Sequence, residues 1–90
     1  DFLEEKTMSR VALVTGGSRG IGAAIAMALK EAGYKVAATY AGNDEKAAAF
    51  TAETGIKTYK WNVASYEESA AGIAQVTADL GAIEVVVANA

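Results

Sequence analysis

The chain has 90 residues, of which 52% are hydrophobic and 21% charged, and its formal net charge is −3. This composition fits one small globular domain and is too apolar for a disordered chain. The absence of cysteine and histidine excludes disulfide frameworks, Cys/His zinc sites and catalysis by a cysteine or histidine nucleophile. The acidic balance disfavours nucleic-acid binding, and no apolar run approaches the ~20 residues of a membrane helix.

The two ends of the chain differ from its middle. Residues 1–8 are mostly polar, with a possible start at Met8, and we expect them to form an extension outside the fold. The first five residues are acidic where a signal peptide would be basic, and the lack of cysteine fits a reducing compartment, so we expect a cytoplasmic protein. Residues 9–90 should form the domain, truncated after its fourth strand because the last strand signal ends at the last residue.

The first half of the domain reads as strand, helix, strand, helix. The continuous apolar run 11–15 predicts a strand buried on both faces. Apolar residues at helical spacing from Ile21 to Leu29 predict a helix, and Gly33 suits its left-handed cap. Residues 35–40 predict a second strand. Asn43 or Asp44 can cap the next helix, which Gly55 ends.

The second half repeats this order. Residues 57–62 alternate in polarity, which predicts an edge strand with one covered face. Residues 65–68 read as a capping box that opens a helix ending at Gly81. Residues 83–88 predict a fourth, buried strand. Connections long enough to carry a helix permit parallel pairing, so the fold class is α/β with a doubly wound parallel sheet.

The most specific motif is the glycine-rich segment 15–22, Thr-Gly-Gly-Ser-Arg-Gly-Ile-Gly, between the first strand and the first helix. A diphosphate needs backbone N–H donors, a positive helix terminus and no Cβ in its way. Gly16 permits a sharp turn, Gly20 permits close approach of the diphosphate, and Gly22 permits close packing of the helix. A phosphate loop of the GxxxxGK[ST] type is excluded, because Ala23 and Ala24 follow Gly22.

The remaining pattern, T-G-x-x-x-G-x-G at Thr15, Gly16, Gly20 and Gly22, resembles the cofactor motif of the short-chain dehydrogenase/reductase family. Two further motifs support the resemblance. The pair Asn62-Val63 is similar to the family's [D/N]-V pair beside the adenine. The last three residues are similar to its N-N-A-G motif, with alanine in place of the first asparagine.

This resemblance implies the amino-terminal half of a Rossmann-type sheet with strand order 3-2-1-4. Segments 41–44 and 59–62 are most similar to bacterial acetoacetyl-CoA reductases of polyhydroxyalkanoate synthesis, with 3-oxoacyl-carrier-protein reductases next. The implied function is the dinucleotide-binding part of an NADPH-dependent reductase that transfers hydride to the ketone of a 3-oxoacyl thioester. The alternative is a non-catalytic, stand-alone half-Rossmann module for nucleotide binding or assembly.

The resemblance also implies what the chain lacks. The family's catalytic serine and its Y-x-x-x-K pair would lie after Ala90, and no tyrosine of this chain has a lysine four residues later. We therefore assign no catalytic residue and no metal ligand here, and expect the thioester to bind only the longer enzyme. The fourth strand would be an uncovered edge, which predicts marginal stability or self-association.

The choice of nucleotide rests on the tip of the second strand. NAD binding usually requires an acidic residue there, whereas this tip is Tyr40-Ala41-Gly42. Arg19 supplies a guanidinium suited to a phosphate, so we expect NADPH. Asp44 is the counter-candidate for an NAD-type acid, although helix capping suits it better. The predicted cofactor-binding residues are Gly16, Ser18, Arg19, Gly20, Ile21, Gly22, Tyr40, Asn62, Val63, Asn89 and Ala90.

Overall fold

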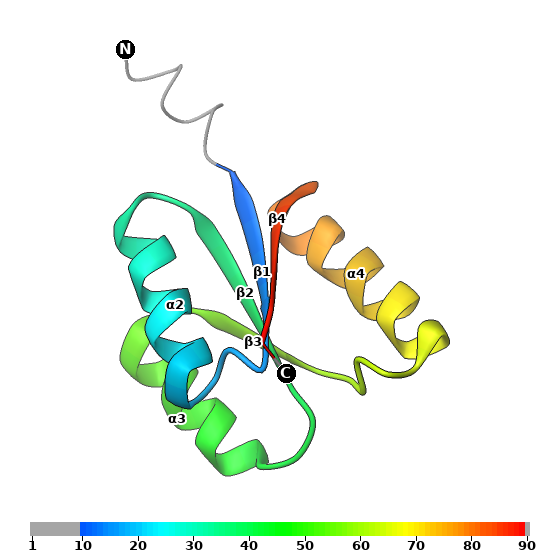
Figure 1. Cartoon of the computed structure of the whole chain (residues 1–90), viewed down its shortest axis with the longest axis horizontal. Coiled ribbons are helices and arrows are strands. Elements are labelled where there is room, and N and C mark those ends of the chain that lie inside the picture. The colour runs from blue at the N-terminus through cyan, green and yellow to red at the C-terminus, as the bar shows by residue number, and fades with distance from the viewer. Residues whose placement is uncertain (1–9, 90) are drawn as a thin grey trace.

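The computed structural model describes residues 10–89 and contains one parallel sheet flanked by helices (Figure 1). The elements follow in the order β1 (Val11–Thr15), α2 (Gly20–Glu31), β2 (Lys35–Tyr40), α3 (Asp44–Thr54), β3 (Lys57–Lys60), α4 (Tyr66–Leu80) and β4 (Ile83–Ala88). The four strands pair in parallel in the order β3-β2-β1-β4, which confirms the predicted fold class.

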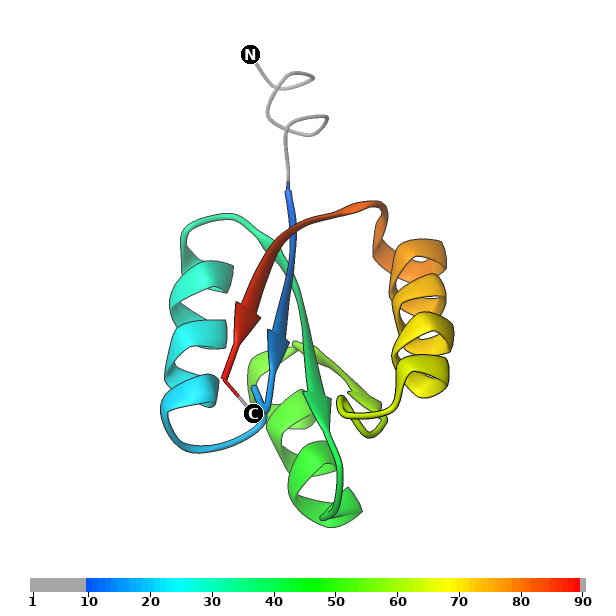
Figure 2. The same cartoon turned by 45° about the vertical axis from the view of Figure 1, so that its right-hand side comes forward.

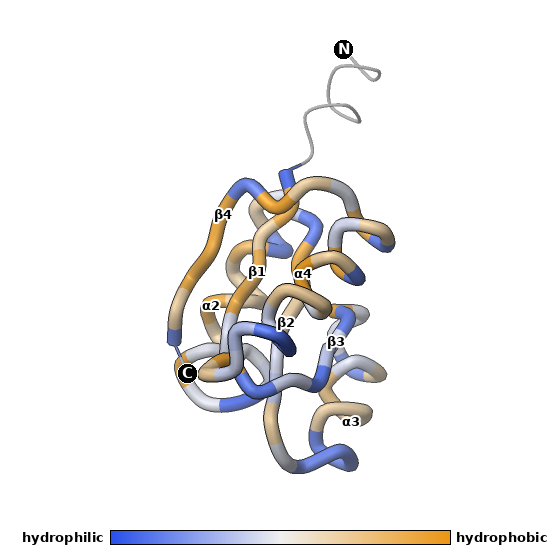
Figure 3. Tube along the Cα trace, turned by 90° about the vertical axis from the view of Figure 1, so that its right-hand side faces the viewer, coloured by the Kyte–Doolittle hydropathy of each residue, from blue (hydrophilic) through white to orange (hydrophobic). Residues whose placement is uncertain are grey.

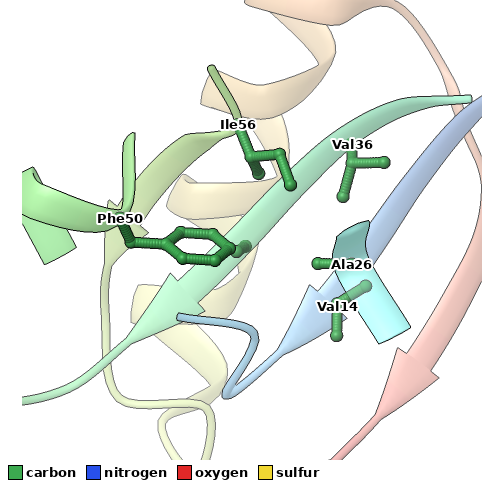
Figure 4. Close-up of a cluster of buried hydrophobic side chains, with 6 residues drawn as sticks. Val14, Ala26, Val36, Phe50 and Ile56 are labelled. Carbon is green, nitrogen blue, oxygen red and sulfur yellow. The ribbon is translucent and has the colours of Figure 1, made fainter. Parts of the chain in front are cut away.

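The helices cover the two faces of the sheet in an uneven way. Helices α2 and α3 lie on one face and α4 lies on the other (Figure 2). On the α2/α3 face, Val14, Val36 and Phe50 belong to one buried cluster (Figure 4). On the α4 face, Leu13 and Trp61 pack with Val76. Both faces of β1 are therefore covered, as its continuous apolar run predicts.

The third strand differs from its prediction in length and in burial. It ends at Lys60 instead of residue 62, although the Trp61 amide still donates to the Tyr40 carbonyl at 3.1 Å. The expectation of one covered face is wrong. The Thr58 hydroxyl meets Thr51 of α3 at 3.1 Å, and the Tyr59 hydroxyl donates to Asp79 of α4 at 2.7 Å. A helix contacts each face even at this edge of the sheet.

The fourth strand is also less buried than predicted. It lies at the other edge of the sheet (Figure 3). Its residues alternate between half-buried and exposed. Val86 pairs with Leu13 but is 61% exposed and does not belong to the cluster that Leu13 forms with Val76 of α4. A register shift between Ile83 and Val85 places Ile83 against the α4 cluster and Val87 against the α2/α3 cluster.

The helix ends mostly confirm the predicted caps. The Asn43 side chain accepts the Lys46 amide at 3.0 Å, so Asn43, and not Asp44, caps α3. Ser65 caps α4 by accepting the Glu68 amide at 3.1 Å. The reciprocal half of the predicted capping box is absent, because the Glu68 carboxylate accepts the Asn62 amide at 2.9 Å instead. Glu68 thus ties α4 to the loop after β3.

Candidate nucleotide-binding cleft

A cleft of about 710 Å³ lies at the carboxyl ends of the four strands. Parallel strands place all their carboxyl ends on one edge of the sheet, where α/β proteins bind ligands. The loops after β1, β2 and β3 line the cleft, and Asn89 after β4 completes it. The lining residues are Gly16, Ser18, Arg19, Gly20, Ile21, Thr39, Tyr40, Ala41, Gly42, Asn43, Lys46, Trp61, Asn62, Val63 and Asn89.

The structure brings together every predicted cofactor-binding residue except Gly22 and Ala90. Gly22 instead packs against Gly16 and Asn89, two residues that line the cleft. A Cβ at this position would collide with the Gly16 carbonyl oxygen and would lie 2.7 Å from Nδ2 of Asn89. Gly22 was expected to permit close packing of the helix, and the reason is that the turn at Gly16 leaves no room for a Cβ. Ala90 lies outside the described residues.

Side chains from two other strands hold the glycine loop in place. The Gly16 amide donates to the buried Thr39 hydroxyl at 3.2 Å, which ties the loop to β2. The Asn89 amide donates to Oγ1 of Thr15 at 2.9 Å, which ties the end of β4 to the end of β1. The Gly16 turn has a φ of 67°, a left-handed conformation that favours glycine.

Gly17 is a further loop position that the sequence interpretation missed. A Cβ there would approach Cβ of Ala38 and the carbonyl oxygen of Val14 to 2.9 Å each. The loop therefore crosses the ends of β1 and β2 too closely for a side chain. In the sequence, Gly17 is visible only as the second of two adjacent glycines. That pattern does not reveal its contact with Val14 and Ala38.

The beginning of α2 is open toward a ligand. Arg19 is its N-cap residue, but it makes no side-chain capping hydrogen bond, and the first turn contains no acidic residue. The first N–H groups of a helix have no partner within the helix and carry its positive dipole end. A Cβ at Gly20 would meet nothing within 4 Å, so this surface is accessible. The arrangement suits an anion bound by backbone amides.

Among residues 10–89, no acidic side chain lines the cleft at the tip of β2. Asp44 does not line the cleft. Its carboxylate accepts the Tyr40 hydroxyl at 3.0 Å and lies 3.2 Å from the Lys60 ammonium. The hydrogen bond from Tyr40, followed by Lys60, lowers the pKa of Asp44. Capping was the wrong expectation for Asp44, which is fixed outside the cleft as a charged group with two partners.

Asn62 has a structural role in the turn after β3. Its side-chain oxygen accepts the Ala64 amide at 2.9 Å and thereby shapes the turn after β3. The same residue and Val63 line the cleft beside Trp61. The role of Asn62 toward adenine stays a prediction, since the turn alone accounts for its side-chain oxygen.

Two kinds of site are absent from the part of the chain that the structure describes. No group of three or more histidine, cysteine, aspartate or glutamate side chains among residues 10–89 could hold a metal ion. Within the same residues, every helix is too short or too polar to cross a membrane.

Comparison with known proteins agrees with this geometry. Residues 10–90 match the family model described as short chain dehydrogenase. An acetoacetyl-CoA reductase of Shinella zoogloeoides is 72% identical over 83 residues, which are 92% of this chain and 34% of that protein. A 3-oxoacyl-[acyl-carrier-protein] reductase of Staphylococcus aureus is 46% identical over 88 residues, 92% of this chain and 36% of that protein.

A solved structure supports the fold independently. A crystal structure of an actinorhodin polyketide ketoreductase with NADPH superposes with a TM-score of 0.83 at 34% identity, covering 91% of this chain and 33% of that one. The chain spans about a third of the length of the relatives that it matches. The sequence motifs, the sheet order and the family match together show that this chain belongs to the short-chain dehydrogenase/reductase family.

Proposed function

We propose that this chain is the dinucleotide-binding part of an NADPH-dependent reductase of 3-oxoacyl thioesters. The reaction would reduce the ketone of acetoacetyl-CoA or a related thioester to a 3-hydroxyacyl product. Similarity to the acetoacetyl-CoA reductase supports this substrate class. The relatives, which are about three times longer, favour this role over a stand-alone nucleotide-binding module.

The observation that carries the proposal is the uncapped beginning of α2 inside the cleft. Backbone amides around Gly20, with no Cβ in front of them, would bind the diphosphate. The loop after β2, including Tyr40, would border the adenosine, and Asn62 and Val63 would border the adenine. Asn89 would lie toward the rest of the cofactor. These residues fit a dinucleotide in size, polarity and charge.

The chemistry of the whole enzyme would come from elsewhere in the longer protein. When bound, the nicotinamide supplies the hydride. The residues of this chain bind and orient the cofactor, and none is proposed to move a proton. The cysteine-free sequence supports a cytoplasmic location for the enzyme.

Calorimetric titration of the chain with NADPH and NADH tests the proposal. We expect both to bind at one site per chain, with NADPH the tighter ligand. Trp61, the single tryptophan of the chain, lines the cleft, so its fluorescence offers a second readout. Absence of binding by both nucleotides would remove the proposed function, while tighter NADH binding would remove the NADPH preference.

The edge of β4 supports a second property of the isolated chain, its self-association. Val86 is exposed on the α4 face, and one side of β4 pairs with no other strand of the described residues. Unpaired apolar edges favour pairing between chains. Sedimentation should show concentration-dependent oligomers that Val86→Lys reduces, whereas a concentration-independent monomer would contradict this proposal.

A further inference from the structure

Thr39 is the only buried polar residue among residues 10–89, and no sequence motif singles it out. It is 1% exposed and belongs to β2, where its buried neighbours Val36, Ala37 and Ala38 are all apolar. A buried hydroxyl without a partner would destabilise the fold. The Thr39 hydroxyl has a partner, since it accepts the Gly16 amide at 3.2 Å. The glycine loop, and not the core, therefore accounts for a polar residue at this position.

The bond between Thr39 and Gly16 lies where the backbone ladder between β1 and β2 ends. The last pair of this ladder is Val14 with Ala38, one residue before Thr39. The chain then turns at Gly16, whose φ of 67° takes it out of the strand. A partly buried backbone N–H that leaves a ladder needs another acceptor. The Thr39 hydroxyl supplies that acceptor from the neighbouring strand.

The position of Gly16 determines where the first turn of α2 lies. The Gly16 carbonyl packs against this turn so closely that a Cβ at Gly22 would collide with the carbonyl oxygen. The Asn89 side chain donates to the same oxygen at 3.5 Å. Gly16 is thus held by Thr39 on its amide side and contacts α2 on its carbonyl side. A displacement of Gly16 would therefore displace the amides of residues 20–22.

The amides that Gly16 places belong to the proposed diphosphate site, and NADPH and NADH both contain this diphosphate. We propose, on the basis of the proposed function, that Thr39 is a positioning residue for the diphosphate: its hydroxyl fixes Gly16 and thereby the N–H donors at the beginning of α2. This role requires an acceptor at Thr39 and no charge. Thr39 therefore sets the affinity for both dinucleotides and not the preference between them.

Calorimetric titration of Thr39→Val with NADPH and NADH tests this proposal. Valine keeps the branched shape but removes the acceptor of the Gly16 amide, so both affinities should fall about tenfold and in equal proportion. Thr39→Ser keeps the hydroxyl and should bind both dinucleotides within about twofold of the unmodified chain. The probe 2′-AMP has the adenosine and its 2′-phosphate but no diphosphate. In an NMR titration, its affinity should be the same for Thr39→Val and the unmodified chain.

Thr58→Val is the matched control for Thr39→Val. Thr58 belongs to β3, the strand beside β2, and its partly buried hydroxyl meets the Thr51 hydroxyl at 3.1 Å. It does not line the cleft. This variant also loses a side-chain hydrogen bond, so it should be less stable than the unmodified chain but bind both dinucleotides with unchanged affinity. Thermal melting of each variant gives the temperatures at which folded chains are compared.

The outcomes separate this proposal from the one on which it rests. Unchanged dinucleotide affinity of folded Thr39→Val would overturn the proposal, as would a loss confined to one dinucleotide, an equal loss for 2′-AMP, or an equal loss in Thr39→Ser. Failure of the unmodified chain to bind both dinucleotides would instead overturn the proposed function. Hydrogen exchange of the unmodified chain tests the anchor without a variant. The Gly16 amide should be protected, and exchange as fast as that of the exposed Gly42 amide would overturn the proposal.

Discussion

The beginnings of α2 and α4 are built in opposite ways within one sheet. Helix α4 has a serine cap and two acidic residues in its first turn, and Glu68 also binds the loop after β3. Helix α2 has no side-chain cap and no acidic residue there. A cap stabilises a helix by about 1 kcal/mol. The start of α2, which lies at the cleft, therefore lacks the stabilising cap and acidic residues. The start of α4 has both.

Substituting Gly22 should lower both the stability of the fold and the affinity of the cleft. In Gly22→Ala, the new Cβ would collide with the Gly16 carbonyl and displace the loop that places the α2 amides. We expect overpacking to cost about 1–3 kcal/mol of unfolding free energy. NADPH affinity should fall more than tenfold, because a small displacement of the donors removes several contacts at once.

Gly72→Ala is the matched comparison for Gly22→Ala on α4. Its Cβ would collide with the ring of the buried Trp61. We expect a similar loss of stability in urea unfolding, but a smaller loss of NADPH affinity at a temperature where the variant is folded. A Gly22→Ala variant with unchanged affinity would contradict the role given to the loop.

Giving α2 a cap like that of α4 should raise the unfolding free energy and remove NADPH binding. Arg19 is extended, with φ −157° and ψ 163°, which suits an aspartate cap. Arg19→Asp should stabilise the chain by about 0.5–1 kcal/mol through the cap and the helix dipole. The same carboxylate would occupy and repel the proposed diphosphate site, so NADPH binding should be abolished.

Arg19→Gln separates the two effects in Arg19→Asp. It removes the cation without adding an anion, so it should weaken NADPH more than NADH and change stability little. Retention of tight NADPH binding by Arg19→Asp would refute an anion site at the start of α2. Urea unfolding and calorimetry measure the two quantities.

Removing the cap of α4 should affect stability alone. Ser65→Ala leaves the Glu68 amide without its acceptor and should cost about 1 kcal/mol of unfolding free energy. NADPH and NADH affinities should stay unchanged, because Ser65 does not line the cleft. A selective loss of NADPH affinity would show that α4 also contributes to the site.

The contact between β3 and α4 should give the smallest effect, visible as a pH dependence. Partial burial, followed by the hydrogen bond to Asp79, raises the pKa of Tyr59 to about 12 from 10.0. A raised pKa in the folded state stabilises the protein fully below pH 10, and this contribution is lost as the pH rises through about 12. The stability difference between the unmodified chain and Tyr59→Phe should therefore be constant from neutral pH up to pH 10 and decrease above it. A difference that grows above pH 10 would contradict the assigned bond.

Local sequence patterns predicted most of the fold for a physical reason. Apolar runs, glycine ends and helix caps act over a few residues, so the four strands, Asn43 and Gly22 could be found without a structure. The alternating burial of β4 could not be predicted, because the exposure of Val86 depends on which parts of the sheet α4 covers, and those contacts are distant in sequence. The helix contacts on both faces of β3 are non-local in the same way.

The residues of the candidate site likewise include some that local sequence patterns reveal and others that depend on non-local contacts. The glycine loop could be found because the turn requires glycines at fixed intervals along the chain, and these intervals are visible in the sequence. The place of Asp44 outside the cleft could not be found, since it depends on the partners of Asp44, and one of these partners, Lys60, comes from β3. The need for glycine at position 17 likewise depends on a non-local contact, the close approach of Ala38 from β2.

The most direct test of the account is an amide-resolved NMR titration of the chain with NADPH. We predict that the largest shifts occur at the amides of residues 20–22, which begin α2, and that those of residues 66–68, which begin α4, stay in place. Shifts confined to other amides, or equal shifts at both helix ends, would contradict the claim that the uncapped end of α2 binds the diphosphate.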